Sequence, residues 1–404
     1  MKLLNWLFTK LRGFQEKKDL SKLAIVTAVE LNDQHGTGIF VRNLLEDPSE
    51  VNVFCSKLIY GGAERHLKIP EDASLDSAAR RLIRNQPVDK ILCVPYFLNE
   101  FRFAVKLKEK TGALLCTFLM DDQNIFTQEV HDRDVQTLLN QSDLILAISP
   151  EMAEVYSRKY NREVLFFPPF VTPRSPFVKS RWNFSKSEEI GRGAMIGNIW
   201  SQKRFAQILD LLDETGISID WYGHGGKAPW LEGTPEEWVK KGLCYHGWLK
   251  KEKLIQKLAE YPFVLLPSGE MDASDDKLSF SKLSLPSRLV FLNARVGVPV
   301  LVLGHPETAA ARFVRRFGTG VSASGQPVAF RQTIEKLLQP EFRSTLLANL
   351  ARHADLWSHD NPGEMIWEAL AGNHQKIRQA EHQKFFKKDR SFRSEICVPA
   401  EIAP

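Results

Sequence analysis

The chain has 404 residues, which is about two domains at roughly 100 to 200 residues per domain. Its 43% hydrophobic and 25% charged residues are typical of a globular protein and exclude a mostly disordered, collagen-like or repeat-array chain. With 54 Lys and Arg against 49 Asp and Glu, the net charge of +5 is too small to indicate nucleic-acid binding, and we expect none. The five cysteines lie far apart without a Cys-x-x-Cys pair, which predicts reduced thiols in a cytoplasmic protein and no zinc site.

Residues 1–18 are predicted to form an amphipathic N-terminal helix. Its apolar stripe runs from Leu3 to Phe14, and basic residues such as Lys10 and Arg12 surround that stripe. The segment lacks the long apolar core and cleavage site of a secretory signal, and the chain has no apolar stretch long enough to span a membrane. Two interpretations stay open: the helix lies on an anionic surface at the inner face of the membrane, or it packs on the protein's own body.

Residues 19–172 are predicted to form a doubly wound α/β domain. Short apolar runs, each followed by a turn signal and a segment of helical period, lie at 23–29, 51–56, 89–97, 113–120, 143–149 and 164–170. Continuous apolar strands that alternate with helices are typical of a parallel sheet covered on both faces.

A connector rich in Pro, Ser, Lys and Arg is expected over 173–192. The alternation of strands and helices then restarts in 193–354, with apolar runs at 193–199, 217–223, 243–247, 263–268, 298–304 and 318–324. This pattern predicts a second α/β domain. Two such domains place the carboxyl ends of two parallel sheets across a cleft, where open α/β sheets usually bind ligands.

The first candidate site is the sequence His-Gly-Thr-Gly that begins at His35. Gly36, Thr37 and Gly38 open a helix, whose free N–H groups and positive dipole end favour a phosphate or a sugar. A dinucleotide fingerprint would need a third glycine where Val41 stands, and a loop that follows the strand directly. A simple tight turn is the alternative interpretation.

The second candidate site follows the first strand of the second domain. Asn198 lies in the loop after that strand, and Lys203 and Arg204 enter the next helix. A pair of cations at this point would neutralise a diphosphate. The alternative is a solvated basic first turn.

The third candidate site lies between Ser281 and Leu289. Pro286 suits the first turn of a helix, and Ser284 or Ser287 is expected to cap it. Arg288 brings positive charge to the same helix end, which predicts a phosphate cradle.

These three loops and the order of elements resemble the GT-B glycosyltransferases, most closely the family 4-like group (glycosyl transferases group 1), from about residue 20 to 367. The matching positions are His35 to Gly38, Gly197 to Lys203, Trp221 to Gly225, Pro267, Ser268, Pro286 to Arg288, Gly297, Pro299 and Val300. The resemblance implies two Rossmann-like domains that face across a cleft, with C-terminal helices over 355–390 crossing back to the first domain. Residues 391–404 are expected to form a tail.

The resemblance implies a hexosyltransferase of polysaccharide biosynthesis that moves a sugar from a nucleotide-sugar donor to a glycan or lipid-linked acceptor. It implies retention of anomeric configuration, no metal, and no cofactor besides the donor substrate. Cations and helix amides would stabilise the charge on the departing diphosphate. The expected donor-binding residues are Gly36, Thr37, Gly38, Asn198, Lys203, Arg204, Gly223, His224, Glu270, Ser284, Ser287 and Arg288.

The sequence departs from the family pattern at two points. Leu292 stands where the family commonly has a Glu for the ribose hydroxyls, and Glu270 or Asp272 is the nearest acid for the sugar. Asp121 and Asp122 stand at a strand end where family members often carry a His. Because paired carboxylates in different environments split their pKa values, we expect Asp121 in the reaction centre and Asp122 as a helix cap, and treat both as catalytic candidates.

Two alternatives to a glycosyltransferase stay open. The absent ribose Glu favours a non-catalytic GT-B-like protein that has lost donor binding. A sugar-nucleotide epimerase shares the architecture and would need acids and histidines around the sugar. The histidines near predicted strand ends, His35, His224 and His246, lack metal-ligand spacing.

Overall fold

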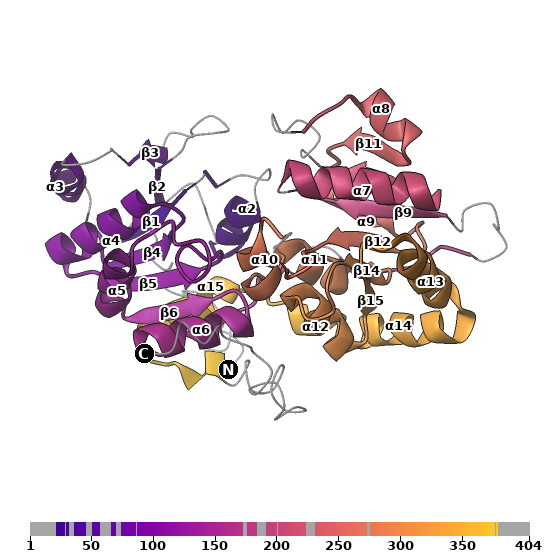
Figure 1. Cartoon of the computed structure of the whole chain (residues 1–404). Coiled ribbons are helices and arrows are strands. Elements are labelled where there is room, and N and C mark those ends of the chain that lie inside the picture. The colour runs from indigo at the N-terminus through magenta and orange to yellow at the C-terminus, as the bar shows by residue number, and fades with distance from the viewer. Residues whose placement is uncertain are drawn as a thin grey trace, which may run out of the picture.

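The computed structural model describes residues 22–378 apart from 29, 32–35, 46–50, 57–65, 70–73, 86, 173–175, 184–190, 200, 224–230, 273–274 and 376. The predicted helix at 1–18, His35, His224 and the predicted tail lie outside the described residues. The described chain forms two α/β bodies that lie side by side (Figure 1).

The first body is built on a seven-stranded parallel sheet in the order β3-β2-β1-β4-β5-β6-β7. Its strands are β1 (Leu23–Thr27), β2 (Asn52–Cys55), β3 (His66–Lys68), β4 (Lys90–Val94), β5 (Leu114–Leu119), β6 (Leu144–Ala147) and β7 (Leu165–Phe166). Its helices are α2 (Gly36–Asn43), α3 (Leu75–Asn85), α4 (Leu98–Thr111), α5 (Asp132–Gln141) and α6 (Pro150–Tyr160). The strand order reverses between β1 and β4, and such a switch point is where open α/β sheets bind ligands.

The second body holds a six-stranded parallel sheet in the order β11-β10-β9-β12-β14-β15. Its strands are β9 (Arg192–Ile196), β10 (Ser218–Tyr222), β11 (Leu243–Gly247), β12 (Val264–Pro267), β14 (Val300–Leu303) and β15 (Gly320–Ala323). Its helices are α7 (Gln202–Thr215), α8 (Pro235–Lys240), α9 (Lys251–Leu258), α10 (Leu278–Leu283), α11 (Ser287–Arg295), α12 (Ala309–Phe317), α13 (Pro327–Leu338) and α14 (Pro340–His353). Its switch point lies between β9 and β12.

The central strands are buried on both faces, which explains their continuous apolar sequence. Every residue of β1 is buried, and in the next layer Phe118 of β5 meets Phe40 of α2 edge-on at 5.1 Å between ring centres. Helices pack on both sides of such strands, so neither face can carry polar side chains at low cost. A further two-stranded sheet pairs β8 (Val178–Lys179) with β13 (Val296–Gly297).

The chain returns to the first body at its C-terminal end. The 3-10 helix η6 (Ala354–Trp357) leads to a parallel bridge between Val171 and Ser358. Helix α15 (Pro362–Leu370) then packs so closely on the first body that a Cβ on Gly363 would lie 1.9 Å from the Leu44 carbonyl oxygen. In Figure 1 the yellow α15 lies at the first body, where it contacts β5. The predicted fold class, two doubly wound domains with a C-terminal helix that crosses back, is confirmed.

No helix in the described part of the chain is both long and apolar enough to cross a membrane.

Candidate functional site

The segment from Ser284 to Arg288, which joins α10 to the first turn of α11, contacts the carboxyl ends of both sheets. Ser284 Oγ donates a hydrogen bond of 3.2 Å to Asp121 Oδ1, just after β5 of the first sheet. Arg288 Nη1 donates to the carbonyls of Ile196 (2.9 Å) and Asn198 (2.8 Å), where β9 of the second sheet ends. In Figure 1, α2, α10 and α11 lie between the two bodies. This junction is the candidate active site, because ligands of open α/β sheets bind at strand carboxyl ends.

Two helix N-termini meet at this junction. A Cβ on Gly36, the first residue of α2, would lie 3.3 Å from the hydroxyl of Ser287, the first residue of α11. The residue before α11 is Pro286, which makes no side-chain cap hydrogen bond. Neither Ser284 nor Ser287 therefore caps α11 as predicted; the Ser284 hydroxyl bonds Asp121 instead. Converging helix N-termini concentrate positive potential and N–H groups, which suits an anion.

Arg288 combines an anchored and an unanchored part. Its Nη1 is bound to the two carbonyls, while no described residue bonds to its Nε or Nη2. Gly197 adopts a φ of +82°, and a Cβ there would lie 3.1 Å from Arg288 Nη1, so the glycine leaves room for the guanidinium. Burial lowers the pKa of Arg288 to about 10, which still leaves it charged at neutral pH. One edge of this cation can therefore meet a ligand.

The ends of β9 and β10 also require glycine. Gly223 has a φ of +146°, and a Cβ on it would lie 3.0 Å from the Gly197 carbonyl oxygen. The Gly197 N–H donates to the Tyr222 carbonyl at 2.9 Å, so the two strand ends touch through backbone atoms. Gly197 and Gly223 thus allow the backbones of the two strand ends to approach closely beside Asn198.

The two cations at the start of α7 have different environments. Ser201 caps this helix by accepting from the Arg204 N–H (3.1 Å). Arg204 donates to the Ser268 carbonyl and lies 3.4 Å from Glu270 Oε1, with its side chain only 14% exposed. Lys203 is exposed and has no ion-pair partner in the described part of the chain. Arg204 and Glu270, both predicted to bind the sugar donor, therefore neutralise each other.

Asp122 organises the loop after β5. Its buried carboxylate accepts hydrogen bonds from the N–H groups of Asn124 (3.0 Å), Ile125 (2.7 Å) and Phe126 (2.8 Å). The Tyr156 hydroxyl donates a fourth bond of 2.8 Å. The predicted helix cap is wrong, because the next helix, α5, begins only at Asp132; Asp122 instead caps a turn. Four bonds leave its oxygens little capacity for a substrate.

Asp121 is the carboxyl group that can change its protonation state here. It is partly exposed but lies deep at the junction, and burial raises its pKa to about 7. Hydrogen bonds from Ser284 and Tyr96 lower this pKa, and the charge of Asp122 raises it. A carboxyl group with a pKa near 7 can accept or donate a proton at neutral pH, as acid–base catalysis requires.

Tyr96 is the site residue that sequence reasoning missed. Its hydroxyl lies 2.5 Å from Thr37 Oγ1, and Tyr96 lowers the pKa of Asp121. Tyr96 follows β4 and Thr37 belongs to the helix after β1, so both lie at the switch point of the first sheet. The signal was present: a polar side chain directly after a buried strand, next to the strand that leads to Asp121.

The position expected to carry a ribose-binding acid lies on α11. Leu292 is fully buried, and Asn293 is buried and donates to the Leu289 carbonyl at 3.0 Å. The half-buried residue on this turn is Phe291, with Lys251 Nζ 6.0 Å from its ring centre. At Leu292, where the resemblance implies a Glu, the side chain is therefore apolar and buried.

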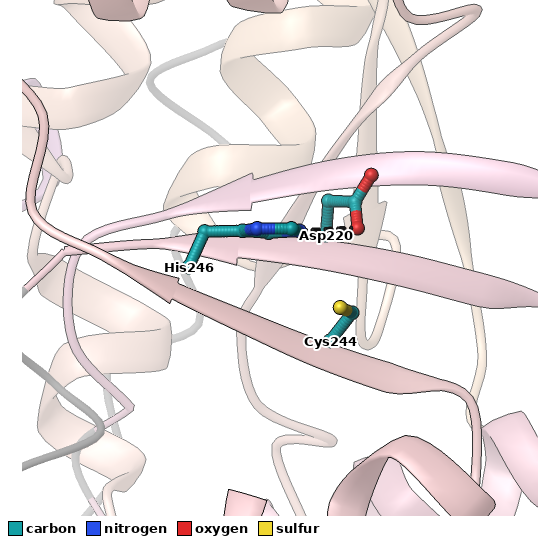
Figure 2. A group of neighbouring side chains, drawn as sticks. All are labelled: Asp220, Cys244 and His246. Atoms are coloured by element: carbon teal, nitrogen blue, oxygen red, sulfur yellow. Dashed lines mark hydrogen bonds and ion pairs between the residues drawn. The ribbon is translucent and has the colours of Figure 1, made fainter.

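A separate polar cluster lies on β10 and β11 (Figure 2). The possible ligand atoms of Asp220, Cys244 and His246 all lie within 4.8 Å of one another, a spacing suited to a metal ion. Sequence spacing did not reveal this cluster, because Asp220 comes from a different strand. The Asp220 carboxylate, however, is already bonded by His246 Nε2 (2.7 Å), by Arg192 (2.7 and 2.8 Å) and by the Tyr261 hydroxyl (2.6 Å).

These bonds argue against a cation at the Asp220 cluster. Burial alone would raise the pKa of Asp220, but the hydrogen bonds from Arg192, Tyr261 and His246 lower it to about 2. A metal ion would have to displace a bidentate guanidinium, one of the stronger charge-assisted pairs in proteins. We interpret the cluster as a clamp that ties β9, β10 and β11 to the residues after α9.

The fold is similar to that of several solved proteins, two of which are named as glycosyltransferases. HepE from Anabaena, in complex with UDP, superposes with a TM-score of 0.62 at 11% identity, over 87% of this chain and 100% of HepE. An α-glucosyltransferase in complex with UDP-glucose and DNA gives 0.52 at 10% identity, over 86% of this chain and 98% of the enzyme. WaaG, a glycosyltransferase involved in lipopolysaccharide biosynthesis, gives a TM-score of 0.51 at 11% identity, over 87% of this chain and 100% of WaaG.

No protein-family model matches the sequence, and no curated protein is significantly similar to it. The structural similarities, at such low identity, establish the GT-B fold that the sequence resemblance implied.

Proposed function

We propose that the protein is a GT-B glycosyltransferase that moves a sugar from a nucleotide-sugar donor. The observation that carries this proposal is the meeting of two helix N-termini, at Gly36 and Ser287, beside a carboxyl group with a pKa near neutrality at Asp121. An anion site next to an acid–base group suits a reaction in which a diphosphate leaves and an acceptor hydroxyl loses a proton. Structural neighbours with UDP or UDP-glucose bound support the assignment.

The diphosphate of the sugar donor would lie between α2 and α11. Gly36, Thr37 and Gly38 would contact it from the first domain, and Ser287 and the unbonded edge of Arg288 from the second. Lys203, exposed at the start of α7, would add charge. Negative charge that develops on the leaving phosphates would be stabilised by these cations and helix amides, without a metal. Asn198 and Gly223 would line the same strand ends, and the Arg204–Glu270 pair would shape the sugar side.

The acceptor would approach from the first domain. Asp121 would orient its hydroxyl or take its proton, while Asp122 holds the loop that carries Asp121. From the family resemblance we further propose a retaining hexosyl transfer onto a glycan or lipid-linked acceptor. We also propose that the protein is cytoplasmic and works at the inner face of an anionic membrane.

Titration calorimetry with UDP, GDP and ADP, followed by assays of sugar release from the matching nucleotide sugars, tests this function. We expect one nucleoside diphosphate to bind clearly better than the others and its sugar nucleotide to be turned over. Leu292, at the position where the family commonly has a ribose-binding Glu, favours one rival, a GT-B-like protein that no longer binds a sugar donor. Failure of all three nucleotides to bind the folded protein would support that rival and contradict the proposal.

A further inference from the structure

The Ser284 hydroxyl forms a contact between the two bodies. Its Oγ donates to Asp121 Oδ1 at 3.2 Å, although the two residues lie 163 positions apart in the chain. Asp121 follows β5 of the first sheet, whereas Ser284 ends α10, in the part of the chain that belongs to the second body. The carboxyl group that the proposed function uses is therefore bonded by a side chain from the opposite domain.

The second body holds Ser284 in place. The residue is buried, and its backbone N–H donates to the Phe280 carbonyl at 3.1 Å. Helix α11 begins three positions later, and Arg288 in its first turn donates to two carbonyls at the end of β9, at 2.9 and 2.8 Å. The position of the Ser284 hydroxyl is thus fixed relative to the second sheet.

The residues that precede Ser284 on α10 pack against the first body. The buried Ser149 hydroxyl donates to the Leu283 carbonyl. Lys282 Nζ lies 4.9 Å from the ring centre of Phe126, in the loop after β5. The hydrogen bond of Ser284 therefore forms inside a packed contact between the two bodies, and the cation of this turn lies over an aromatic ring.

We propose that Ser284 is a positioning residue, which from the second domain fixes the orientation of the Asp121 carboxylate and does not hold the sugar donor. The inference deepens the proposed function, on which its catalytic meaning rests. A serine hydroxyl has a single hydrogen, and Ser284 donates it to Asp121. The remaining lone pairs of that oxygen would repel a phosphate, so the bond to Asp121 and a bond to the diphosphate exclude each other.

The groups around Asp121 determine the sign of the effect. Burial raises the pKa of Asp121 most, and the charge of Asp122 raises it further, whereas hydrogen bonds from Ser284 and Tyr96 lower it. A hydrogen bond donated to a carboxylate favours the charged form. Removal of the Ser284 hydroxyl leaves both raising effects and takes away one lowering effect, so the pKa of Asp121 must rise.

The direct test is a carbon-13 NMR titration of the full chain with labelled aspartate carboxyl groups. The Asp121 signal is assigned by its loss in Asp121→Asn. We expect Ser284→Ala and Ser284→Cys to raise the Asp121 pKa by about half a unit to one unit. Cysteine keeps the side-chain volume, so no water replaces the hydroxyl, and its thiol is a weak donor. Ser284→Thr keeps a hydroxyl and should leave the pKa nearly unchanged.

Ser281→Ala is the matched control. Ser281 lies one turn earlier on α10 and is also buried, but its hydroxyl donates to Asp275 Oδ2 at 2.6 Å, within the second body. Its loss removes a buried hydroxyl from the same helix and should leave the Asp121 titration nearly unchanged. The inference is overturned if folded Ser284→Ala and Ser284→Cys both titrate like the wild-type protein, or if Ser281→Ala shifts the Asp121 pKa as far as they do.

Activity and binding separate a positioning role from donor binding. A rise of one pKa unit from about 7 lowers the ionised fraction at pH 7 about fivefold, and kcat of Ser284→Ala should fall by about that factor. The acidic limb of its pH profile should move up with the NMR shift, while the dissociation constant for UDP stays the same. A clear loss of UDP affinity would assign Ser284 to the sugar donor and overturn the inference. If the NMR shift occurs but no sugar nucleotide is ever turned over, the Ser284 inference stands and the proposed function fails.

Discussion

Arg204 and Arg288 both lie in the first turn of a helix beside a strand end, yet their charges are compensated differently. Glu270 lies 3.4 Å from Arg204, so this pair presents little net charge. Among the described residues, Arg288 bonds only carbonyl oxygens, which leave its full charge in place. Sequence position alone could not separate the two, because Glu270 is 66 residues from Arg204 in the chain.

Replacing Lys203 or Arg288 with Ala should raise the dissociation constant of the bound nucleoside diphosphate about tenfold or more, since a charge-assisted hydrogen bond contributes about 1.5 to 3 kcal/mol. Titration calorimetry measures this change. Arg204→Ala is the matched control and should weaken binding less, because Glu270 already neutralises that cation. Unchanged affinity in both the Lys203 and Arg288 variants would contradict the assigned diphosphate site.

The same substitution should lower turnover at Asp121 but stability at the adjacent Asp122. Asp121→Asn should lower turnover about 100-fold or more at unchanged stability, because it removes the group that exchanges a proton. Asp122→Asn should instead lower the free energy of unfolding by about 1 to 3 kcal/mol, because an amide cannot accept all four bonds. Steady-state rates and urea denaturation separate the two effects. A folded Asp122→Asn protein that loses turnover while Asp121→Asn keeps it would reverse the assignment.

At the scale of elements, the strands that lie in apolar runs were predictable, whereas β3 and β8 were not. The runs at 23–29, 113–120 and 298–304 contain β1, β5 and β14, because burial on both faces leaves a strong local signal. Strand β3 contains His66 and Lys68 and is mostly exposed, so it lacks that signal. Strand β8 lies in the predicted connector and has two residues, which pair with a strand more than 100 positions away.

The candidate site was predictable to the level of strand ends. Asp121, Thr37 and Arg288 each follow or precede a buried strand in the sequence, and parallel strands bring their carboxyl ends together. The partners of these residues depend on tertiary distance: Ser284 reaches Asp121 across 163 positions, and Tyr156 reaches Asp122 across 34. The sequence therefore indicated the strand ends and set Asp121 apart from Asp122, but it did not indicate which residues bond each carboxylate.

The clamp at Asp220 should stabilise the second sheet without metal. The pKa of Asp220 in the folded state, about 2, lies below the ordinary value of 3.8. The contribution of Asp220 to the free energy of unfolding is therefore present above about pH 4 and is lost as the pH falls toward 2. Asp220→Asn should lower the free energy of unfolding at pH 7 by about 2 kcal/mol or more, measured by urea denaturation. Cys244→Ser, which keeps a hydroxyl in place of the thiol, is the control and should change it little.

A second measurement tests whether the Asp220 cluster is structural or binds a metal ion. Melting temperature should not respond to added Zn²⁺ or to a chelator, because Arg192 already occupies the Asp220 carboxylate. This interpretation would be contradicted if Zn²⁺ raised the melting temperature and if His246→Ala and Cys244→Ala each abolished that rise.

At the scale of the whole molecule, the contacts that join the two bodies beside the candidate site include three among the described residues. Helix α6 of the first body packs on α10, and the Ser149 hydroxyl donates to the Leu283 carbonyl. Glu151 of α6 forms an ion pair of 3.2 Å with Arg312 of α12, with the two side chains 4% and 10% exposed. The third contact is the Ser284–Asp121 hydrogen bond. Domain docking and the environment of Asp121 are therefore coupled, because α10 takes part in both.

Breaking the Glu151–Arg312 pair should loosen this docking. Burial raises the pKa of Glu151, and Arg312 opposes that rise, so each charge depends on the other. Arg312→Ala would leave a buried carboxyl group without its partner, at a cost of about 3 to 5 kcal/mol. Arg315→Ala is the matched control, since its exposed pair with Glu307 at 3.0 Å contributes about 0 to 1 kcal/mol.

Thermal unfolding measures the stability of these variants, and small-angle X-ray scattering measures the arrangement of their two domains. Arg312→Ala should lower the melting temperature clearly more than Arg315→Ala and should increase the radius of gyration. The double variant Glu151→Leu with Arg312→Met should recover much of the lost stability, because it removes both buried charges together and fills their volume with apolar groups. If Arg312→Ala behaves like Arg315→Ala in both measurements, the ion pair does not hold the domains. Apolar packing of α15 on the first body would then be the contact that sets their arrangement.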